Sequence, residues 1–104
     1  MINEWHEKTL GEIGMSFYGL PVVHPMRCKD GFEVSVQASS IHYCVPRSNN
    51  AHPYKAFELG YPSEKDDLIM EYAEDPENPT GTVYAYVPVE VVEKLVEKHG
   101  GIFE

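Results

Sequence analysis

The residues best suited to chemistry are concentrated in residues 40–63, the stretch SIHYCVPRSNNAHPYKAFELGYPS. Arg47 carries a planar guanidinium, which matches the oxygen geometry of phosphates and carboxylates. Pro46 stiffens the point at which the chain is expected to leave a strand and enter a loop. Asn49 and Asn50 add amide donors beside the cation. This combination favours noncovalent binding of an anionic, nucleotide-like ligand.

Aromatic side chains bracket the same loop. Tyr43 precedes it and Tyr54 follows it, and either ring can stack on a base. The predicted ligand-binding residues are Arg47, Tyr43, Asn49, Asn50, Tyr54, Lys55 and His42, and Arg27 and Lys29 are expected to add positive potential. A second interpretation leaves this surface without a ligand. In it, Arg47 pairs with a carboxylate such as that of Glu58, and the tyrosines form the edge of the core.

A histidine and a cysteine in this stretch suggest a different chemistry. On a strand, His42 and Cys44 would project from one face, which places a thiol beside a base. A small Cys/His enzyme is therefore a further alternative, although a strand cysteine is more often a small buried hydrophobe. Zinc accepts the set His42, Cys44 and His52, but it normally takes four ligands at closer paired spacing. We expect no metal, no cofactor and no catalytic residue.

The charge of the chain is large, negative and unevenly distributed. The formal net charge of −9 opposes general binding to nucleic-acid backbones. Residues 20–57 nevertheless contain four Lys or Arg against two acids, whereas residues 58–104 contain twelve acids against three lysines. The acidic half is interpreted either as solvated surface or as a face that binds a protein or mimics DNA. The basic part is consistent with a local anion site.

Length and composition set the class of the protein. A chain of 104 residues predicts a single domain, residues 1–104, with one modest core. No apolar run approaches the roughly 20 residues of a membrane span, and the polar N-terminus predicts no secretory signal. Two cysteines, Cys28 and Cys44, are too few for a disulfide framework. We therefore expect reduced thiols, a cytosolic setting and no membrane partner.

Helices and strands must position these residues. Residues 1–14 are predicted to form a mobile arm or a short helix, which Trp5 would anchor to the core. Residues 26–39 predict a β-hairpin that turns at Asp30-Gly31. After the turn, alternation places Phe32, Val34, Val36 and Ala38 in the core and Glu33, Ser35, Gln37 and Ser39 in solvent. Residues 41–44 predict a short strand, and residues 46–53 predict a loop.

The second half predicts two strands and two helices. Residues 54–60 predict a strand. Residues 61–75 predict a short helix with Ser63 as its candidate N-cap, and a strand through residues 67–73 is the alternative. Residues 82–88 predict a strand with Val83, Ala85 and Val87 opposite Tyr84 and Tyr86. Residues 88–101 predict an amphipathic helix with an apolar stripe formed by Val91, Val92, Leu95, Val96 and His99. His6 and His99 show no partner pattern. The predicted fold is α+β, a small antiparallel sheet with the C-terminal helix packed on one face.

Several phrases give the chain a resemblance. SVQAS (35–39), YCVPR (43–47), ELGYPS (58–63), VYAYVP (83–88) and HGG (99–101) resemble a group of short uncharacterised proteins encoded by bacteriophages and prophages. The resemblance covers residues 31–101 and implies a viral protein that acts in the host bacterial cytoplasm. Small accessory phage proteins often act against host defence. Some sequester cyclic nucleotide or ADP-ribose-derived signals, often as homo-oligomers, and this chain would use the Arg47 loop for that function. Others cover the surface of a defence complex, as anti-CRISPR-like inhibitors or DNA mimics do, and this chain would use its acidic half for that function.

Overall fold

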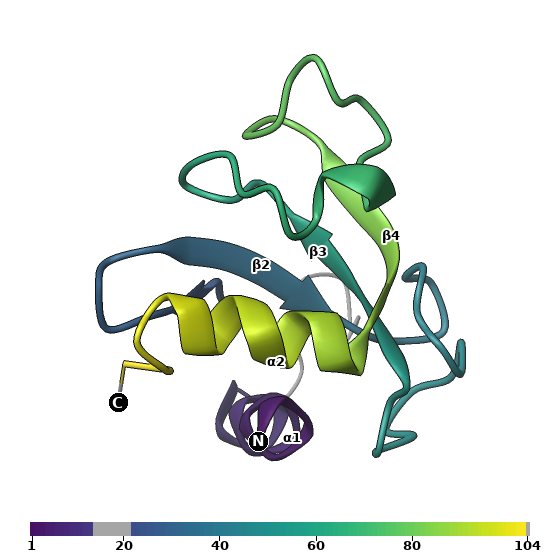
Figure 1. Ribbon diagram of the computed structural model, residues 1–104. Coiled ribbons are helices and arrows are strands. Elements are labelled where there is room, and N and C mark those ends of the chain that lie inside the picture. Colours follow the sequence, from purple (N-terminus) through teal and green to yellow (C-terminus); the bar gives the residue numbers. More distant parts are fainter. Residues whose placement is uncertain (14–21, 104) are drawn as a thin grey trace.

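The computed structural model describes residues 1–13 and 22–103. Its elements are the helix α1 (Ile2–Ile13), the strands β1 (Met26–Arg27), β2 (Glu33–Gln37) and β3 (Ala56–Gly60), the 3-10 helix η2 (Met70–Tyr72), the strand β4 (Val83–Pro88) and the helix α2 (Val89–Lys98). The strands form one sheet in the order β1-β2-β3-β4, and every neighbouring pair is antiparallel. In Figure 1, α2 crosses one face of the sheet and α1 lies next to α2. The predicted α+β class is confirmed.

The β1–β2 hairpin forms where the sequence predicts it. Gly31 adopts a φ of 96°, a conformation that favours glycine, and the carboxylate of Asp30 accepts a hydrogen bond from the Phe32 amide at 2.9 Å. The predicted core residues of this hairpin are all buried: Phe32, Val34, Val36 and Ala38. The prediction that Gln37 and Ser39 face solvent is wrong. Gln37 is buried because its amide group bonds the backbone of Val23 as both donor and acceptor.

Both α-helices contribute to the core. Val92, Leu95 and Val96 of α2 are buried against the sheet, and burying each such side chain contributes about 1.5–3 kcal/mol. Residues 2–13 form a helix and not a mobile arm. Ile2 is buried in the core, its amide donates to the Glu93 carboxylate at 2.7 Å, and Trp5 packs against the core as expected. Neither helix of the described chain has the length and hydrophobicity needed to cross a membrane.

Two segments do not form the predicted elements. Residues 41–44 are not a strand, and only Val45 pairs, through an isolated bridge to Ala56. The segment 61–75 contains only the single turn of η2. Ser63 does not cap a helix there, because its hydroxyl accepts a hydrogen bond from the Glu33 amide at 2.9 Å. Contacts with the rest of the fold therefore outweigh local helix signals in this segment.

A β-bulge changes the predicted alternation of β4. Phe57 pairs with Val87 and Leu59 pairs with Tyr84, so β4 contains one extra residue opposite β3. Tyr86 takes up the irregularity with a φ of 53°. As a result Tyr84 and Val87 are both buried, whereas Tyr86 is exposed. The expected opposition of Tyr84 and Tyr86 to the valines is therefore wrong.

Candidate functional site

Tyr54 stabilises the loop that carries Arg47 through hydrogen bonds to the loop backbone. The Tyr54 hydroxyl donates to the Ser48 carbonyl at 2.5 Å and accepts from the Ala51 amide at 3.1 Å. The Tyr54 amide donates to the Asn3 side chain of α1 at 2.7 Å. Because Tyr54 is only 1% exposed, it cannot stack on a ligand. Its predicted contact role is wrong, and its role is to hold the loop.

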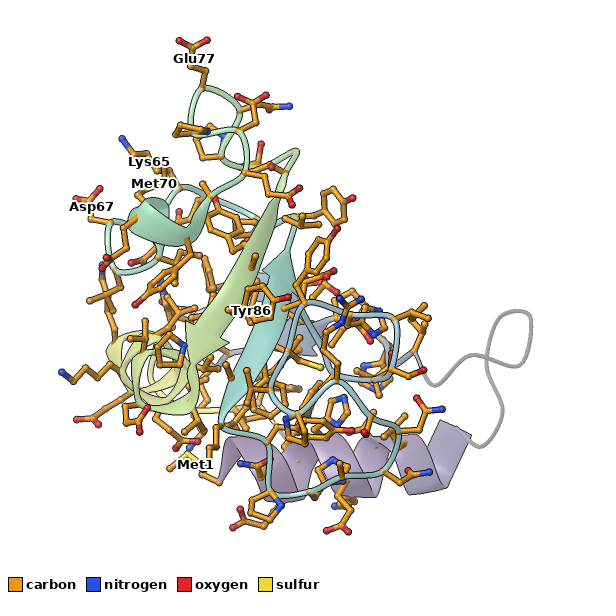
Figure 2. All side chains as sticks on the ribbon, turned by 90° about the vertical axis from the view of Figure 1, so that its right-hand side faces the viewer. Met1, Lys65, Asp67, Met70, Glu77 and Tyr86 are labelled. Atoms are coloured by element: carbon orange, nitrogen blue, oxygen red, sulfur yellow. The ribbon has the colours of Figure 1, made fainter. Side chains whose placement is uncertain are left out.

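Arg47 lies on the face of an aromatic ring. Its guanidinium carbon is 5.3 Å from the centroid of the Tyr43 ring, and the Tyr43 and Tyr86 rings are 5.8 Å apart. Figure 2 shows Tyr86 on β4, and its amide donates to the Tyr43 carbonyl at 3.0 Å. Arg47, Tyr43 and Tyr86 are all exposed. The sequence predicts Tyr86 only as part of one face of a strand. In the structure its ring lies beside the ring of Tyr43, where the ring of Tyr54 is expected.

The Glu58 carboxylate does not pair with Arg47. It accepts a hydrogen bond from the Tyr43 amide at 2.9 Å. The ion pairs of the described side chains do not include Arg47. The interpretation in which Arg47 pairs with Glu58 is therefore wrong for the described chain, and Arg47 is an exposed residue whose guanidinium lies over the Tyr43 ring.

The remaining predicted contact residues lie near Arg47 but differ in what they offer. Asn49, Asn50 and Lys55 are exposed. The side-chain oxygen of Asn49, however, already accepts a hydrogen bond from the Ser40 amide at 2.9 Å. His42 is half-buried, and its Nδ1 bonds the Ser39 hydroxyl at 2.6 Å. Burial lowers the pKa of His42, and the charge of Glu58 offsets this only in part. His42 is therefore neutral at pH 7 and adds no positive charge.

The Arg47 surface is open and partly apolar. Ile41, Tyr43, Val45 and Tyr86 are all large hydrophobic residues that are at least 39% exposed. Three cavities on the described surface, lined around Trp5, Ser63 and His52, do not include Arg47 or either tyrosine. A ligand on this surface is thus covered on one side only, unless a second molecule supplies the opposite wall.

Arg27 and Lys29 belong to a different strand from the one that the Arg47 loop joins. They lie in and just after β1, the first strand of the order β1-β2-β3-β4, whereas Val45, two residues before Arg47, pairs with Ala56 of β3. Arg27 has an aromatic partner of its own, since its guanidinium lies 5.3 Å from the Phe103 ring. The expectation that these residues add positive potential to the loop stays a prediction.

The Cys44 thiol is placed as a core group. It is 1% exposed and donates to the Ser39 carbonyl at 3.2 Å. Burial raises its pKa, which keeps it protonated at neutral pH. Because residues 41–44 are not a strand, the argument that placed His42 and Cys44 on one strand face fails. Within the described ranges, no group of three or more His, Cys, Asp and Glu residues is arranged to hold a metal ion.

His99, which showed no partner pattern in the sequence, joins three distant segments. Its Nδ1 lies 2.7 Å from Asp30 and its Nε2 lies 2.8 Å from the buried Asp66. Its ring stacks on Phe32 at 4.0 Å, and Lys98 also pairs with Asp66 at 3.2 Å. Burial alone would lower the pKa of His99, but the hydrogen bonds that its ring donates to both carboxylates, together with their charges, raise the pKa overall. Both ring nitrogens are occupied, so His99 fastens the fold and cannot serve as a free base.

A second histidine network fastens the Arg47 loop to α1. His6 is fully buried, and its Nδ1 lies 2.8 Å from Nε2 of His52. Among the described residues, His6 Nε2 is the one buried side-chain polar atom without a hydrogen-bond partner. Burial first, and then the charges of His52 and His42, lower the pKa of His6 to about 4. His6 is therefore a neutral ring at pH 7.

Comparison of the chain with protein-family models, curated proteins and solved structures gives no match. The resemblance to phage-encoded proteins therefore stays a prediction.

Proposed function

We propose that this chain captures an anionic, nucleotide-like ligand through Arg47, Tyr43 and Tyr86. The observation that supports the proposal is the guanidinium of Arg47, which rests on the Tyr43 ring and has no carboxylate partner in the described chain. The ring restricts the guanidinium before a ligand arrives, so less side-chain entropy is lost on binding. A phosphate would take the N–H fork, and a base would stack on Tyr86.

The mechanism that fits these residues is stoichiometric capture without turnover. The Cys44 thiol is buried, and both nitrogens of His99 are bonded to carboxylates. The resemblance to phage proteins supports an anti-defence role, in which a cyclic nucleotide or ADP-ribose-derived signal is sequestered in the host bacterial cytoplasm. The open Arg47 surface favours a homo-oligomer, because a second copy facing it would close the site.

Substitution of Arg47 tests the proposal. We expect wild-type protein to bind ADP-ribose or a cyclic dinucleotide in isothermal titration calorimetry. A charge-assisted hydrogen bond contributes about 1.5–3 kcal/mol, so Arg47→Ala should weaken binding by about 10- to 150-fold. Arg27→Ala is the matched control, because Arg27 also lies over an aromatic ring but belongs to β1. Full affinity in Arg47→Ala, equal losses in both variants, or no binding of either probe by wild type would refute the proposal.

A second candidate function uses the acidic segment, in which the chain inhibits a host defence complex by binding its basic surface. Exposed acids lie along residues 64–77, and Figure 2 shows Asp67 and Glu77 projecting outward from it. The buried Asp66 does not belong to this face. Charge reversal at Asp67, Glu71 and Glu74 should then abolish capture of a purified defence complex while Arg47→Ala leaves it intact. The opposite pattern would favour the Arg47 surface.

A further inference from the structure

A cavity of about 330 Å³ lies between α1, the β1–β2 turn and the C-terminal residues 101–102. Its volume is in the range of small-molecule sites in proteins, about 300–1,000 Å³. The residues that line it are Met1, Glu4, Trp5, Lys8, Lys29, Gly101 and Ile102. Arg47 does not line it, and it is not part of the function proposed above.

Two lysines from different elements line this cavity. Lys8 belongs to α1 and Lys29 follows β1, and the ion pairs of the described residues include neither of them. Glu4 also lines the cavity, but its carboxylate is bonded by the amine of Met1. The cavity therefore has two positive charges to which the described chain supplies no carboxylate partner.

The Lys29 side chain is held close to the cavity wall. Its backbone amide donates to the Gly101 carbonyl at 2.9 Å, which ties the hairpin turn to the C-terminal segment. Gly101 adopts a φ of 95°, and a Cβ at that position would lie 4.0 Å from the Lys29 amine. The lysine stem thus passes over a residue without a side chain, which leaves room beside its amine.

Apolar groups form the rest of the wall. Trp5 and Ile102 are both half-buried, and the Trp5 and His24 rings meet in a T-shaped contact with centroids 6.1 Å apart and planes at 82°. This contact restrains the indole, and a restrained flat ring suits stacking by a flat ligand. The cavity thus combines an aromatic wall with two cations, which suits a molecule with a flat apolar body and an anionic end.

We propose that this cavity binds a small aromatic anion, a carboxylate or a phosphate monoester, between Trp5 and the amines of Lys8 and Lys29. The ring of the ligand stacks on the indole, and its anionic oxygens accept hydrogen bonds from the lysines. The proposal also gives Lys29 a role beside β1, in a cavity that Arg47 does not line.

The single tryptophan of the chain reports on this cavity directly. Phenyl phosphate is the probe, and phenol and inorganic phosphate are its two separated halves. We expect phenyl phosphate to change Trp5 emission saturably at low salt, to bind more tightly than either half, and to weaken as salt is raised. Partly exposed charge pairs contribute about 0.2–1 kcal/mol, so Lys29→Gln and Lys8→Gln should each weaken binding about 1.4- to fivefold.

Lys94→Gln is the matched control, because Lys94 is an exposed lysine of α2 outside the cavity. It should bind phenyl phosphate like wild type, as should Arg47→Ala, whose behaviour separates this site from the Arg47 surface. Backbone amide shifts of Lys29 and Gly101 in NMR spectra should move with the same binding curve. Absence of saturation with phenyl phosphate, wild-type affinity in both lysine variants, or an equal loss in Lys94→Gln would overturn the proposal.

Discussion

Burial of His6 should cost the folded chain stability in mild acid. Burial and the charges of His52 and His42 lower the pKa of His6 from 6.5 to about 4. The unfolded chain therefore binds more protons in this window, so the free energy of unfolding falls as pH falls from 6.5 towards 4. One pKa unit corresponds to about 1.4 kcal/mol. The loss between pH 7 and pH 4 is thus roughly 3 kcal/mol, a large part of the stability of a small domain.

The substitution His6→Phe isolates this effect, because it keeps a ring against Tyr54 and Phe57 and removes the titrating group. Urea unfolding followed by Trp5 fluorescence, at several pH values between about 7.5 and 4, gives the free energy of unfolding of each protein. We expect the two proteins to differ by at most about 1 kcal/mol near neutrality, and the variant to be more stable by roughly 3 kcal/mol at the acid end. His24→Phe, at an exposed histidine, is the control and should follow wild type. Parallel pH profiles for wild type and His6→Phe would refute the reasoning.

Two further predictions concern the hydrogen bonds of His99 and Tyr54, which also stabilise the fold. The pKa of His99 is raised by Asp30 and Asp66, so its contribution is complete below pH 6.5 and is lost as pH rises through the raised pKa. His99→Gln should therefore cost about 3 kcal/mol in urea unfolding at pH 6 and less at pH 8, and an equal cost at both values would contradict this assignment. Tyr54→Phe removes the hydroxyl that bonds the Ser48 carbonyl and the Ala51 amide. It should cost about 1–2 kcal/mol and speed hydrogen exchange of the Ala51 amide, and unchanged exchange there would count against the fastening role.

The features that the sequence predicted correctly depend on neighbouring residues. Asp30-Gly31 marks the hairpin turn through the left-handed conformation that glycine accepts, and the alternation after it places Val34 and Val36 in the core. The helix α2 is predicted from apolar residues that recur with a period of 3.6 residues, a pattern that is already visible among residues close in the sequence. Arg47 and Tyr43 also meet as neighbours along one short segment.

The features that the sequence did not predict depend on long-range contacts. Asp30, Asp66 and His99 are separated by more than thirty residues each, and no local pattern indicates that one imidazole bonds both carboxylates. Tyr54 is buried because loop carbonyls and amides surround its hydroxyl, which a strand pattern does not reveal. Tyr86 reaches the Arg47 surface through a bulge in β4, and a bulge shifts the alternation on which the prediction rests.

The two histidine networks fasten the two cationic surfaces with opposite dependence on protonation. The contact between His6 and His52 holds the Arg47 loop to α1, and the pKa of His6 is lowered, so acid weakens this fastening. The contact of His99 with Asp30 holds the hairpin turn directly after Lys29, which lines the cavity, and the pKa of His99 is raised, so alkali weakens this contact. Near-neutral pH is therefore the range in which both networks stabilise the fold together. A change of pH in either direction therefore weakens one of the two networks first.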